Sequence, residues 1–320
     1  MAAPRRVLIA GGTGMIGRAL VRALLEDGSH SVVVVGRSLD RIGQTFGSRV
    51  DAETYESLHS LHPTDVVVNL VGENVGAPLW WNESTMNQIL HSRVTATRRL
   101  AQLVADSGAR MLTASGVSIY GSQPEGETVG VDEGASVAGS GDRSFLTHVA
   151  LRWEEAAATL VPRERIVFLR FGVVLERGEG ALYKMALPFY LGMGGRLGGG
   201  EQIISWVSLV DCVRSIIFLI QEGVSLCGPV NIAAGRVTQS NFASCLGRAL
   251  WRPALVPTPS FALRLALGSH MADSLVLCSH SVRAAVLEAN GFRFRDCELG
   301  PTLKAIFGGS WFGIELPGLL

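Results

Sequence analysis

The sequence lacks the long apolar runs and the excess of one charge that mark several large classes of protein. No apolar run reaches the roughly 18–20 residues that a helix needs to span a bilayer, although the mean hydropathy is +0.30. Lys+Arg and Asp+Glu both number 28, which gives no support for binding to nucleic acid or to an anionic membrane. The surplus of apolar residues therefore favours a sheet covered on both faces, or a surface for a protein partner.

Cysteine is also scarce, and its spacing predicts neither a metal site nor a redox motif. No C-x-x-C pair occurs, and no secretory signal precedes the five cysteines, which are Cys212, Cys227, Cys245, Cys278 and Cys297. This pattern predicts reduced, mostly buried thiols in a reducing compartment. The first strand begins at once, so the N-terminal segment is too short for a transit peptide. We expect a cytoplasmic protein, with the mitochondrial matrix as the alternative.

Apolar stretches and helical spacing alternate along the first half of the chain. Strands are expected at Arg6–Ala10, Ser31–Val35, Val66–Leu70, Arg110–Ala114 and Ile166–Leu169, and helices at Ile16–Leu25, Ala52–Leu61, Asn82–Asp106 and Ser144–Leu160. Uninterrupted apolar strands are typical of a parallel sheet that is covered on both faces. The alternation predicts an α/β fold with a doubly wound parallel Rossmann sheet and right-handed crossovers.

A glycine-rich loop, Gly11-Gly12-Thr13-Gly14-Met15-Ile16-Gly17, follows the first strand. Glycines let the backbone come close to a pyrophosphate, and the next helix offers unpaired N–H groups at its positive dipole end. Here Gly12-x-Gly14-x-x-Gly17 stands between a strand and a helix, as a dinucleotide site requires. The loop predicts dinucleotide binding; the alternative is a tight turn without a ligand.

The end of the second strand indicates which dinucleotide is bound. An acidic residue at this position would bond the ribose 2′-hydroxyl of NAD, whereas an arginine accommodates the 2′-phosphate of NADP. This chain has Gly36-Arg37-Ser38. The missing acid also argues against S-adenosylmethionine, and the absence of a GK[ST] motif after the glycines excludes a P-loop. We predict NADP(H), against the alternative that Arg37 is a solvated surface residue.

The alternation of strands and helices ends near Leu175, and a glycine-dense stretch follows at Gly192–Gly200. We expect an NADP-binding Rossmann domain over residues 1–175, to which residues 206–235 return. Residues 176–320 should form mostly a smaller C-terminal cap or substrate domain over the carboxyl edge of the sheet. The tail from Phe307 to Leu320 is apolar, with Glu315 as its one charge. This tail, or an apolar surface, is a candidate for binding a protein partner.

Several short motifs resemble one protein family. The first is Ala10-Gly-Gly-Thr-Gly-Met-Ile-Gly17, which resembles the opening of the extended short-chain dehydrogenase/reductases (SDRs). The others resemble an atypical branch of them, the epimerase-family proteins: Val68-Asn-Leu-Val-Gly-Glu73, Trp81 with Asn82, Ser92-Arg93, Trp153-Glu154, Arg170-Phe-Gly-Val-Val-Leu175 and Gly228-Pro-Val-Asn231. The resemblance runs from about residue 5 to residue 306.

The resemblance implies positions for the parts of a bound NADP(H). Residues implied to line the pyrophosphate are Gly11, Gly14, Met15 and Ile16, and Thr13 of the same loop is implied to bind the cofactor. Those implied at the adenosine-side phosphate are Gly36 and Arg37. Leu70, Val71 and Gly72 should pack near the adenine-proximal ribose, and Val173 and Val174 beside the nicotinamide. Gln88 and Arg93 lie on the next helix, where Arg93 either approaches the cofactor or forms a surface ion pair. Ser115 should line the pocket.

The usual catalytic pair of the SDR family, Tyr-x-x-x-Lys, is missing. Its tyrosine exchanges a proton, and its lysine lowers the pKa of that tyrosine. None of the four tyrosines has a lysine four residues later: Tyr55 precedes His59, Tyr120 precedes Pro124, Tyr183 precedes Leu187 and Tyr190 precedes Gly194. Alignment places Phe145 and Val149 at the two positions, and Gly116 at that of the usual serine. The catalytic residues are therefore unknown.

Other groups could replace the missing pair. His148 titrates near neutral pH, but an exposed helix histidine is the simpler interpretation; Ser118 and Tyr120 are further pocket candidates, and Tyr120 is more often a packed aromatic. Trp206 and Gln202 are candidates for a cap wall. The branch usually has a histidine where this chain has Ser208, and Ser208-x-x-Asp211 reads as a structural capping box.

Two function classes therefore remain open. The first is an NADP(H)-dependent oxidoreductase or epimerase acting on an unidentified small molecule. The second is a non-catalytic NADP(H)-binding scaffold or sensor that binds a protein partner. An intact cofactor loop fits both classes, and the missing tyrosine and lysine favour the second.

Overall fold

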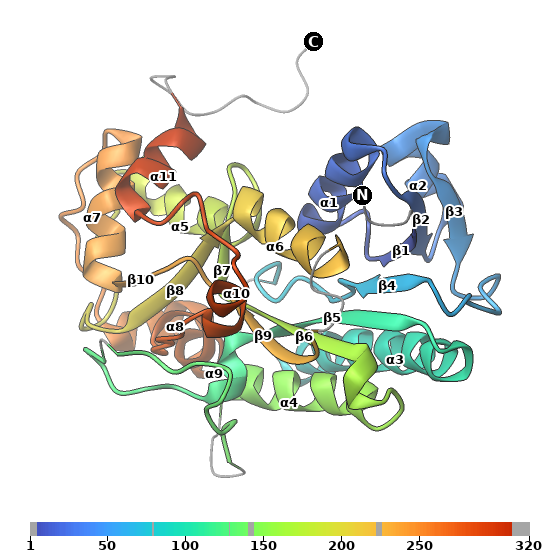
Figure 1. Ribbon diagram of the computed structural model, residues 1–320. Helices are drawn as coiled ribbons and strands as arrows, with labels where there is room; N and C mark the ends of the chain where they lie inside the picture. Colours follow the sequence, from blue (N-terminus) through green and yellow to red (C-terminus); the bar gives the residue numbers. More distant parts are fainter. Residues whose placement is uncertain (1–4, 79, 128, 140–143, 222–225, 309–320) are drawn as a thin grey trace.

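Seven parallel strands form the central sheet of the computed structural model, which describes residues 5–78, 80–127, 129–139, 144–221 and 226–308 (Figure 1). The strands are β1 (Arg6–Ala10), β2 (Ser31–Gly36), β3 (Asp51–Thr54), β4 (Val66–Asn69), β5 (Arg110–Gly116), β6 (Ile166–Phe171) and β9 (Gly228–Ile232), in the order β3-β2-β1-β4-β5-β6-β9. Each neighbouring pair is parallel. The predicted doubly wound Rossmann sheet is confirmed, and its order reverses between β1 and β4, where such sheets bind ligands.

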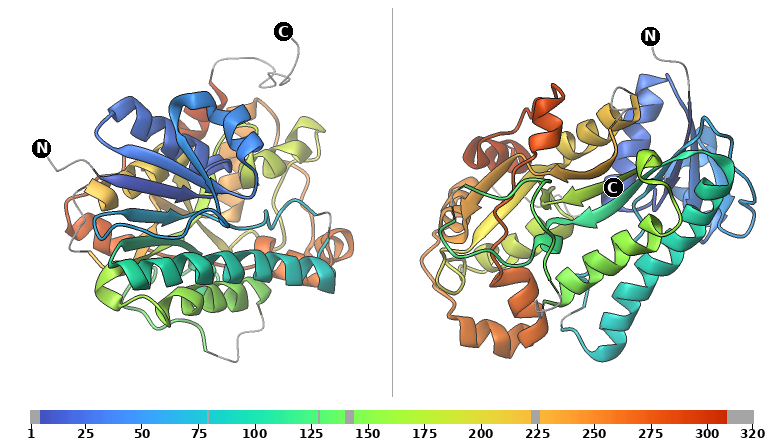
Figure 2. Two further views of the ribbon diagram at one scale, coloured as in Figure 1. Left: turned by 90° about the vertical axis from the view of Figure 1, so that its right-hand side faces the viewer. Right: turned by 60° about the horizontal axis from the view of Figure 1, so that its bottom comes forward.

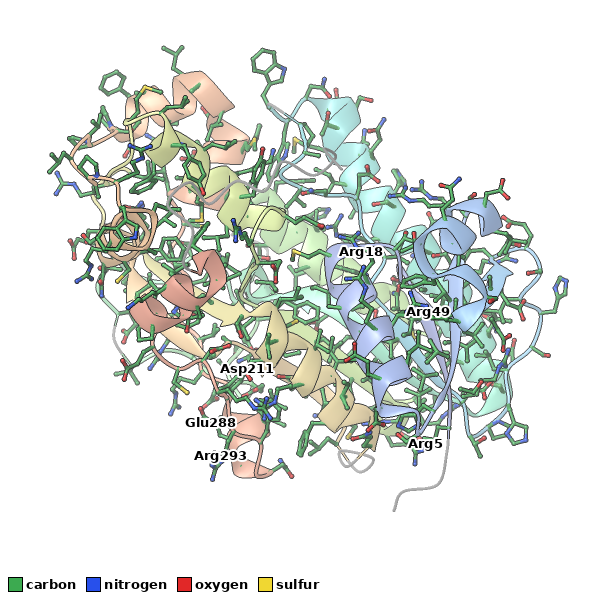
Figure 3. The ribbon with its side chains drawn as sticks, turned by 90° about the horizontal axis from the view of Figure 1, so that it is seen from above. Arg5, Arg18, Arg49, Asp211, Glu288 and Arg293 are labelled. Carbon is green, nitrogen blue, oxygen red and sulfur yellow. The ribbon has the colours of Figure 1, made fainter. Side chains whose placement is uncertain are left out.

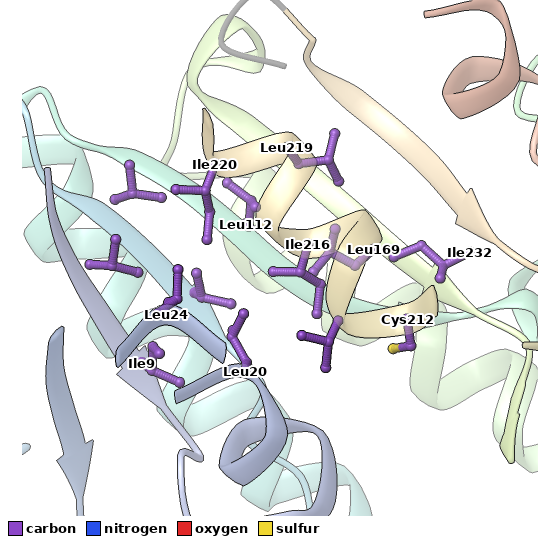
Figure 4. Close-up of a cluster of buried hydrophobic side chains, with 14 of the residues drawn as sticks. Ile9, Leu20, Leu24, Leu112, Leu169, Cys212, Ile216, Leu219, Ile220 and Ile232 are labelled. Carbon is purple, nitrogen blue, oxygen red and sulfur yellow. The ribbon is translucent and has the colours of Figure 1, made fainter. Parts of the chain in front are cut away.

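Helices cover both faces of this sheet (Figures 1 and 2). One face packs against α1 (Met15–Asp27), α2 (Leu39–Phe46) and α6 (Leu209–Gln221), and the other against α3 (Glu83–Ser107) and α4 (Phe145–Ala158). Alternate residues of β1 serve the two layers, since Ile9 lies in the first core and Leu8 in the second. Figure 4 shows Ile9 among Leu20, Leu24 and Ile216. Each fully buried side chain of this kind contributes about 1.5–3 kcal/mol.

The expected helix Ala52–Leu61 is wrong. Asp51–Thr54 instead forms β3, which pairs in parallel with β2 at the edge of the sheet. The crossover helix is α2, which lies earlier in the chain. Ser38 caps its N-terminus by accepting a hydrogen bond from the backbone N–H of Arg41 at 3.3 Å, and Ile42 and Phe46, one turn apart, bury its apolar side.

A second sheet and its helices form the cap. The chain leaves β6 at Gly172 and enters β7 (Val173–Leu175), which pairs with β8 (Ile203–Ser208), and β8 pairs with β10 (Gly235–Thr238). The fully buried Trp206 lies in a core with α5 (Gly180–Tyr190), α7 (Gln239–Leu250) and α11 (Leu299–Phe307). Shorter helices follow α7: α8 (Ser260–Leu267), α9 (Ser269–Met271) and α10 (Ala285–Ala289). Helix α6 and strand β9 lie with the central sheet.

Ser208 and Asp211 have structural roles, as predicted, but the described hydrogen bonds give only the serine half of a capping box. The Ser208 hydroxyl accepts a hydrogen bond from the Asp211 backbone N–H at 3.1 Å and donates one to Asp296 at 2.5 Å. The buried Asp211 carboxylate accepts from the backbone N–H groups of Arg295 and Asp296 at 2.7 and 2.8 Å. This serine therefore joins the start of α6 to the segment before α11.

The expectations about membrane-spanning helices and about the cysteines can be compared with the described part of the chain. None of its helices combines the length and the apolar character that crossing a bilayer requires. No disulfide joins its cysteines; Cys212 and Cys245 are buried, while Cys227 and Cys297 are exposed, so burial of the thiols is less general than expected.

Candidate functional site

The glycine loop turns sharply between β1 and α1. Gly11 has φ +80°, and a Cβ there would lie 2.7 Å from the carbonyl oxygen of Leu70. The Gly14 N–H donates to the Gly11 carbonyl at 3.0 Å, and the Gly14 carbonyl accepts from the Arg18 N–H at 2.8 Å, which begins α1. Only glycine combines this left-handed backbone with so close an approach to the end of β4.

The glycines of the loop serve two different purposes. A Cβ on Gly17 would lie 2.3 Å from the Gly11 oxygen, and one on Gly12 would lie 2.7 Å from Val34, so both glycines are needed for packing. A Cβ on Gly14 would meet only the Gly11 oxygen at 3.3 Å, and Gly14 is exposed. No side chain of the described residues caps α1 at this residue. The first-turn N–H groups, including those of Met15 and Ile16, are therefore open to an anion.

Two arginines lie where β2 ends and α2 begins. Arg37 is exposed, and neither it nor Arg41 forms an ion pair within the described ranges. Arg37 lies close enough to Tyr55 to oppose the burial that raises the pKa of that phenol to about 12. The sequence reasoning missed Arg41, although its position four residues after Arg37, with Ser38 as the helix cap, was a usable signal. Together they offer two cations at the start of a helix.

The end of β4 lies directly against the glycine loop. The Leu70 N–H donates to the Ala10 carbonyl at 2.9 Å, and the Val71 N–H donates to the Asn69 side-chain oxygen at 3.2 Å. The buried Asn69 amide donates in turn to Thr97 at 2.8 Å and to Thr113 at 3.0 Å. Leu70 and Val71 are partly buried, and Gly72 is exposed. The end of β4 therefore lies beside the glycine loop, and the role of Leu70, Val71 and Gly72 at the ribose stays a prediction.

Arg93 lies beneath Gly72, so that a Cβ on Gly72 would fall 2.9 Å from the guanidinium carbon. Arg93 is 9% exposed, donates to the Ile89 carbonyl at 3.0 Å and stacks over the Trp153 ring at 4.9 Å. No carboxylate of the described residues reaches ion-pair distance. Burial lowers its pKa to about 10, against an opposing effect of Glu73. The alternative of a surface ion pair is therefore wrong.

Gln88 is exposed on α3. It precedes Arg93 by five residues, which places it about 140° away around the helix. The structure does not bring these two side chains to one face, and the role of Gln88 stays a prediction.

Ser115 belongs to a buried network that the spacing of residues did not reveal. Its hydroxyl donates to the Glu154 carboxylate at 2.7 Å. Arg170 donates to both carboxylate oxygens of Glu154, from Nε at 2.8 Å and from Nη2 at 2.9 Å. The hydroxyl of Ser115 therefore points toward α4. In the sequence, the ion pair between Glu154 and Arg170 was indicated only by the fact that each residue belongs to a family-like motif, Trp153-Glu154 and Arg170-Phe171.

Tyr120 completes the same network. Its hydroxyl accepts from Arg170 at 2.8 Å and donates to the Asn231 side chain at 2.9 Å, and its ring lies 4.9 Å below the guanidinium. Burial raises the pKa of Tyr120, and Arg170 opposes that effect. With both hydrogen-bonding functions occupied, Tyr120 is the packed aromatic that the simpler interpretation favoured.

The two residues predicted to stand at the positions of the usual tyrosine and lysine lie in an apolar cluster. Phe145 and Val149, one turn apart on α4, are 9% and 3% exposed. The Trp81 ring contacts Phe145 edge to face, with ring centroids 5.2 Å apart, and Met271 closes the cluster from the cap. His148 lies between them in sequence but is exposed. The described side chains of this cluster carry no group that would exchange a proton with a substrate.

The remaining predicted residues lie on the cap side. Val173 is partly buried in β7, beside Trp206 of β8. Trp206 is fully buried and Gln202 is 1% exposed, with its amide donating to the carbonyls of Leu197 and Val276 at 3.0 and 3.1 Å. These two residues belong to the interior of the cap. Among the described residues no cluster of His, Cys, Asp or Glu has metal-binding geometry.

The fold and the loop define a Rossmann protein of the atypical SDR class, and comparisons with known proteins agree. A family model for the NAD dependent epimerase/dehydratase family matches residues 7–140, and one for a domain of unknown function (DUF1731) matches residues 258–306. An epimerase family protein of Mycobacterium bovis is 36% identical over 300 residues, covering 93% of this chain and 96% of that protein. The chain belongs to this epimerase family.

Solved structures extend the comparison. A crystal structure of the human epimerase family protein SDR39U1 (isoform 2) with NADPH has a TM-score of 0.81 and 34% identity, covering 94% of this chain and 98% of that one. A UDP-glucuronic acid 4-epimerase of Bacillus cereus has a TM-score of 0.73 at 18% identity, covering 94% and 97% of the two chains, and shares the fold.

Proposed function

We propose that this protein binds NADP(H) at the carboxyl ends of β1, β2 and β4. The observation that carries the proposal is the pairing of an open glycine loop with exposed arginines at the start of α2. The loop presents the N–H groups of Met15 and Ile16, at the start of α1, to a pyrophosphate. Arg37 and Arg41 present cations to a 2′-phosphate. The NADPH in the human SDR39U1 structure supports the same assignment.

The adenine-proximal ribose would lie against Leu70, Val71 and Gly72, with Arg93 beneath the last of them. Arg93 then supplies a buried positive charge to the phosphate side of the site. On the other side, Val173 of β7 would face the nicotinamide. When bound, the dinucleotide supplies or accepts hydride.

Removing one arginine tests the nucleotide preference. The Arg37→Ala variant should raise the Kd for NADPH about tenfold or more and leave the Kd for NADH nearly unchanged, because a phosphate–guanidinium bond contributes about 1.5–3 kcal/mol. Fluorescence titration with each nucleotide measures both constants. Arg22→Ala, which removes an exposed arginine from α1, is the control and should change neither Kd. An equal loss of affinity for both nucleotides would refute the role of Arg37.

On this binding site two functions can be built: an oxidoreductase or epimerase for an unidentified small molecule, and a non-catalytic NADP(H)-binding scaffold or sensor. The apolar surroundings of Phe145 and Val149 favour the second. Reduction of a carbonyl compound needs a proton donor as well as hydride. The hydrocarbon side chains of Phe145 and Val149 cannot donate that proton. A bound nucleotide would still stabilise the folded protein by mass action. The protein partner of such a scaffold stays a prediction, and the predicted tail lies outside the described residues.

A screen of carbonyl compounds separates these functions. We expect no NADPH oxidation above the rate without protein, measured by the loss of nicotinamide absorbance. The informative control is His148→Ala, which removes the exposed histidine on α4. Clear turnover in the unsubstituted protein that this variant abolishes would establish an enzyme and overturn the scaffold function.

A further inference from the structure

Arg18 links the glycine loop to the cap. It belongs to the first turn of α1, and in the view from above it lies at the end of this helix nearest the centre of the molecule (Figure 3). One guanidinium nitrogen donates to the Thr13 carbonyl at 2.7 Å. Another donates to both carboxylate oxygens of Glu179, one of them at 2.6 Å. The loop carbonyl thus fixes the guanidinium beside the N–H groups proposed to hold the pyrophosphate.

Glu179 comes from the segment between β7 and α5, which lies over the start of α1. The next residue, Gly180, has φ +67°, and a Cβ there would meet the Met15 thioether at 3.2 Å. Glu176 of the same segment is half-buried, and burial together with Glu179 raises its pKa. The Glu179 carboxylate therefore stands near a place suited to an anionic pyrophosphate, with Glu176 on the same segment. A carboxylate opposes the binding of a second anion beside it, so this arrangement needs an explanation.

We propose that Arg18 is a nucleotide-binding residue that holds the pyrophosphate of NADP(H), and that Glu179 pairs with the same guanidinium as an internal anion until the nucleotide displaces it. The inference rests on the proposed NADP(H) binding and adds to it a residue and a competitor. Arg18 keeps its bond to Thr13 and exchanges a carboxylate for a phosphate oxygen. No covalent step is involved.

The exchange is energetically feasible because the ion pair lies near the surface. The side chains of Arg18 and Glu179 are 26% and 48% exposed. Pairs with this exposure contribute about 0.2–1 kcal/mol, whereas the planar guanidinium can donate two parallel, charge-assisted hydrogen bonds to phosphate oxygens, each roughly twice as strong as a neutral one. A pyrophosphate that also accepts the loop N–H groups therefore competes well with a single carboxylate.

A double-mutant cycle tests the competition, with Kd for NADPH measured by titration at fixed ionic strength. Glu179→Gln should lower Kd about two- to fivefold, because a weak competitor is lost. Arg18→Met should raise Kd about tenfold. In the Arg18→Met background, Glu179→Gln should change Kd less than about twofold, since the group for which it competes is gone. Glu164→Gln, at an exposed residue before β6, controls for the loss of one negative charge.

A second probe, 2′-AMP, carries the 2′-phosphate but no pyrophosphate. Its Kd should respond to Arg37→Ala and stay unchanged in the Arg18 and Glu179 variants. An unchanged or raised Kd for NADPH in Glu179→Gln overturns the inference. The inference also fails if Glu179→Gln lowers Kd by the same factor in the Arg18→Met background as in the unsubstituted protein, because that would show a long-range charge effect. If neither NADPH nor 2′-AMP binds the unsubstituted protein, the proposed function fails; if both bind and Glu179 has no effect, only this inference fails.

Discussion

Arg93 and Arg110 show how one residue type serves two purposes in the same sheet. Both are 9% exposed, and burial lowers the pKa of each to about 10. Arg110 lies at the amino end of β5, where it donates to the carbonyls of Leu219 and Leu226 at 2.7 and 2.6 Å. Arg93 has one carbonyl and an aromatic ring beside the site. A buried charge with so few acceptors is costly, and a bound dinucleotide would offset that cost.

This contrast gives a prediction at the residue scale. Because the folded-state pKa of Arg93 is lowered, its charged form costs stability at every pH below about 10. At neutral pH, Arg93→Met should leave the nucleotide-free Tm unchanged or raise it, and should raise the Kd for NADPH about tenfold. Arg110→Met should lower the Tm and leave the Kd unchanged, since two carbonyls lose their donor. Thermal unfolding and nucleotide titration measure both. A lowered Tm with an unchanged Kd in Arg93→Met would show a merely structural role.

At the scale of elements, α4 carries Phe145 and Val149, which the sequence alignment predicts to stand where the usual SDR tyrosine and lysine would be. Met271 of the cap packs in the same apolar cluster as these two residues. On the same helix, the Trp153 indole donates a hydrogen bond to Thr97 of α3, and the Glu154 carboxylate accepts one from Ser115 of β5. Helix α4 therefore joins cap and sheet by packing, where its counterpart in the usual arrangement carries out proton transfer.

Introducing a lysine into this helix tests that description. Val149→Lys should destabilise the fold by about 3 kcal/mol or more, because it buries an ammonium group without a partner. For a chain of 320 residues, with an unfolding entropy of about 2.1 cal/mol/K per residue, that corresponds to a fall in Tm of about 4–5 °C or more. His148→Lys adds the same charge one residue away on the exposed side and should change the Tm little. Equal tolerance of both variants, measured by circular dichroism on heating, would mean that the site is open.

The sequence predicted the central strands well and the crossover to β3 poorly, because only the central strands have a strong apolar pattern. Buried parallel strands such as Val66–Asn69 are uninterrupted apolar runs, so their pattern depends little on context. The short α2 has only Ile42 and Phe46 to mark its buried side, and β3 at the sheet edge carries Asp51 and Glu53. Edge position, which sequence periodicity does not encode, decided between helix and strand there.

For the candidate site the limit was sequence separation. Residues of one loop, such as Gly11 and Gly14, could be assigned to a strand–loop–helix turn from their spacing in the sequence alone. The pairs Glu154–Arg170 and Arg18–Glu179 join segments 16 and 161 residues apart, and only the folded chain brings them together. The same holds for Met271 over Phe145. Spacing thus predicted the conformation of the glycine loop between β1 and α1, and the tertiary structure added the residues around it.

At the scale of the whole molecule, the proposed nucleotide site lies where the central sheet meets the cap. The central sheet contributes the glycine loop and Arg37, and the cap contributes β7 and the segment that bears Glu179. A dinucleotide bound here would contact both and stabilise the folded chain, by about 2.7 kcal/mol at a hundred times its Kd. Large apolar side chains stay exposed on the cap, among them Trp251, Leu255 and Leu265 at 82%, 79% and 86%.

The most direct test of the central claim is isothermal titration of the unsubstituted protein with NADPH and with NADH in the same buffer. We predict that NADPH binds one molecule per chain with a Kd at least about tenfold lower than that for NADH, because Arg37 and Arg41 meet a phosphate that NADH lacks. Absence of binding, or equal affinity for the two nucleotides, would contradict the account.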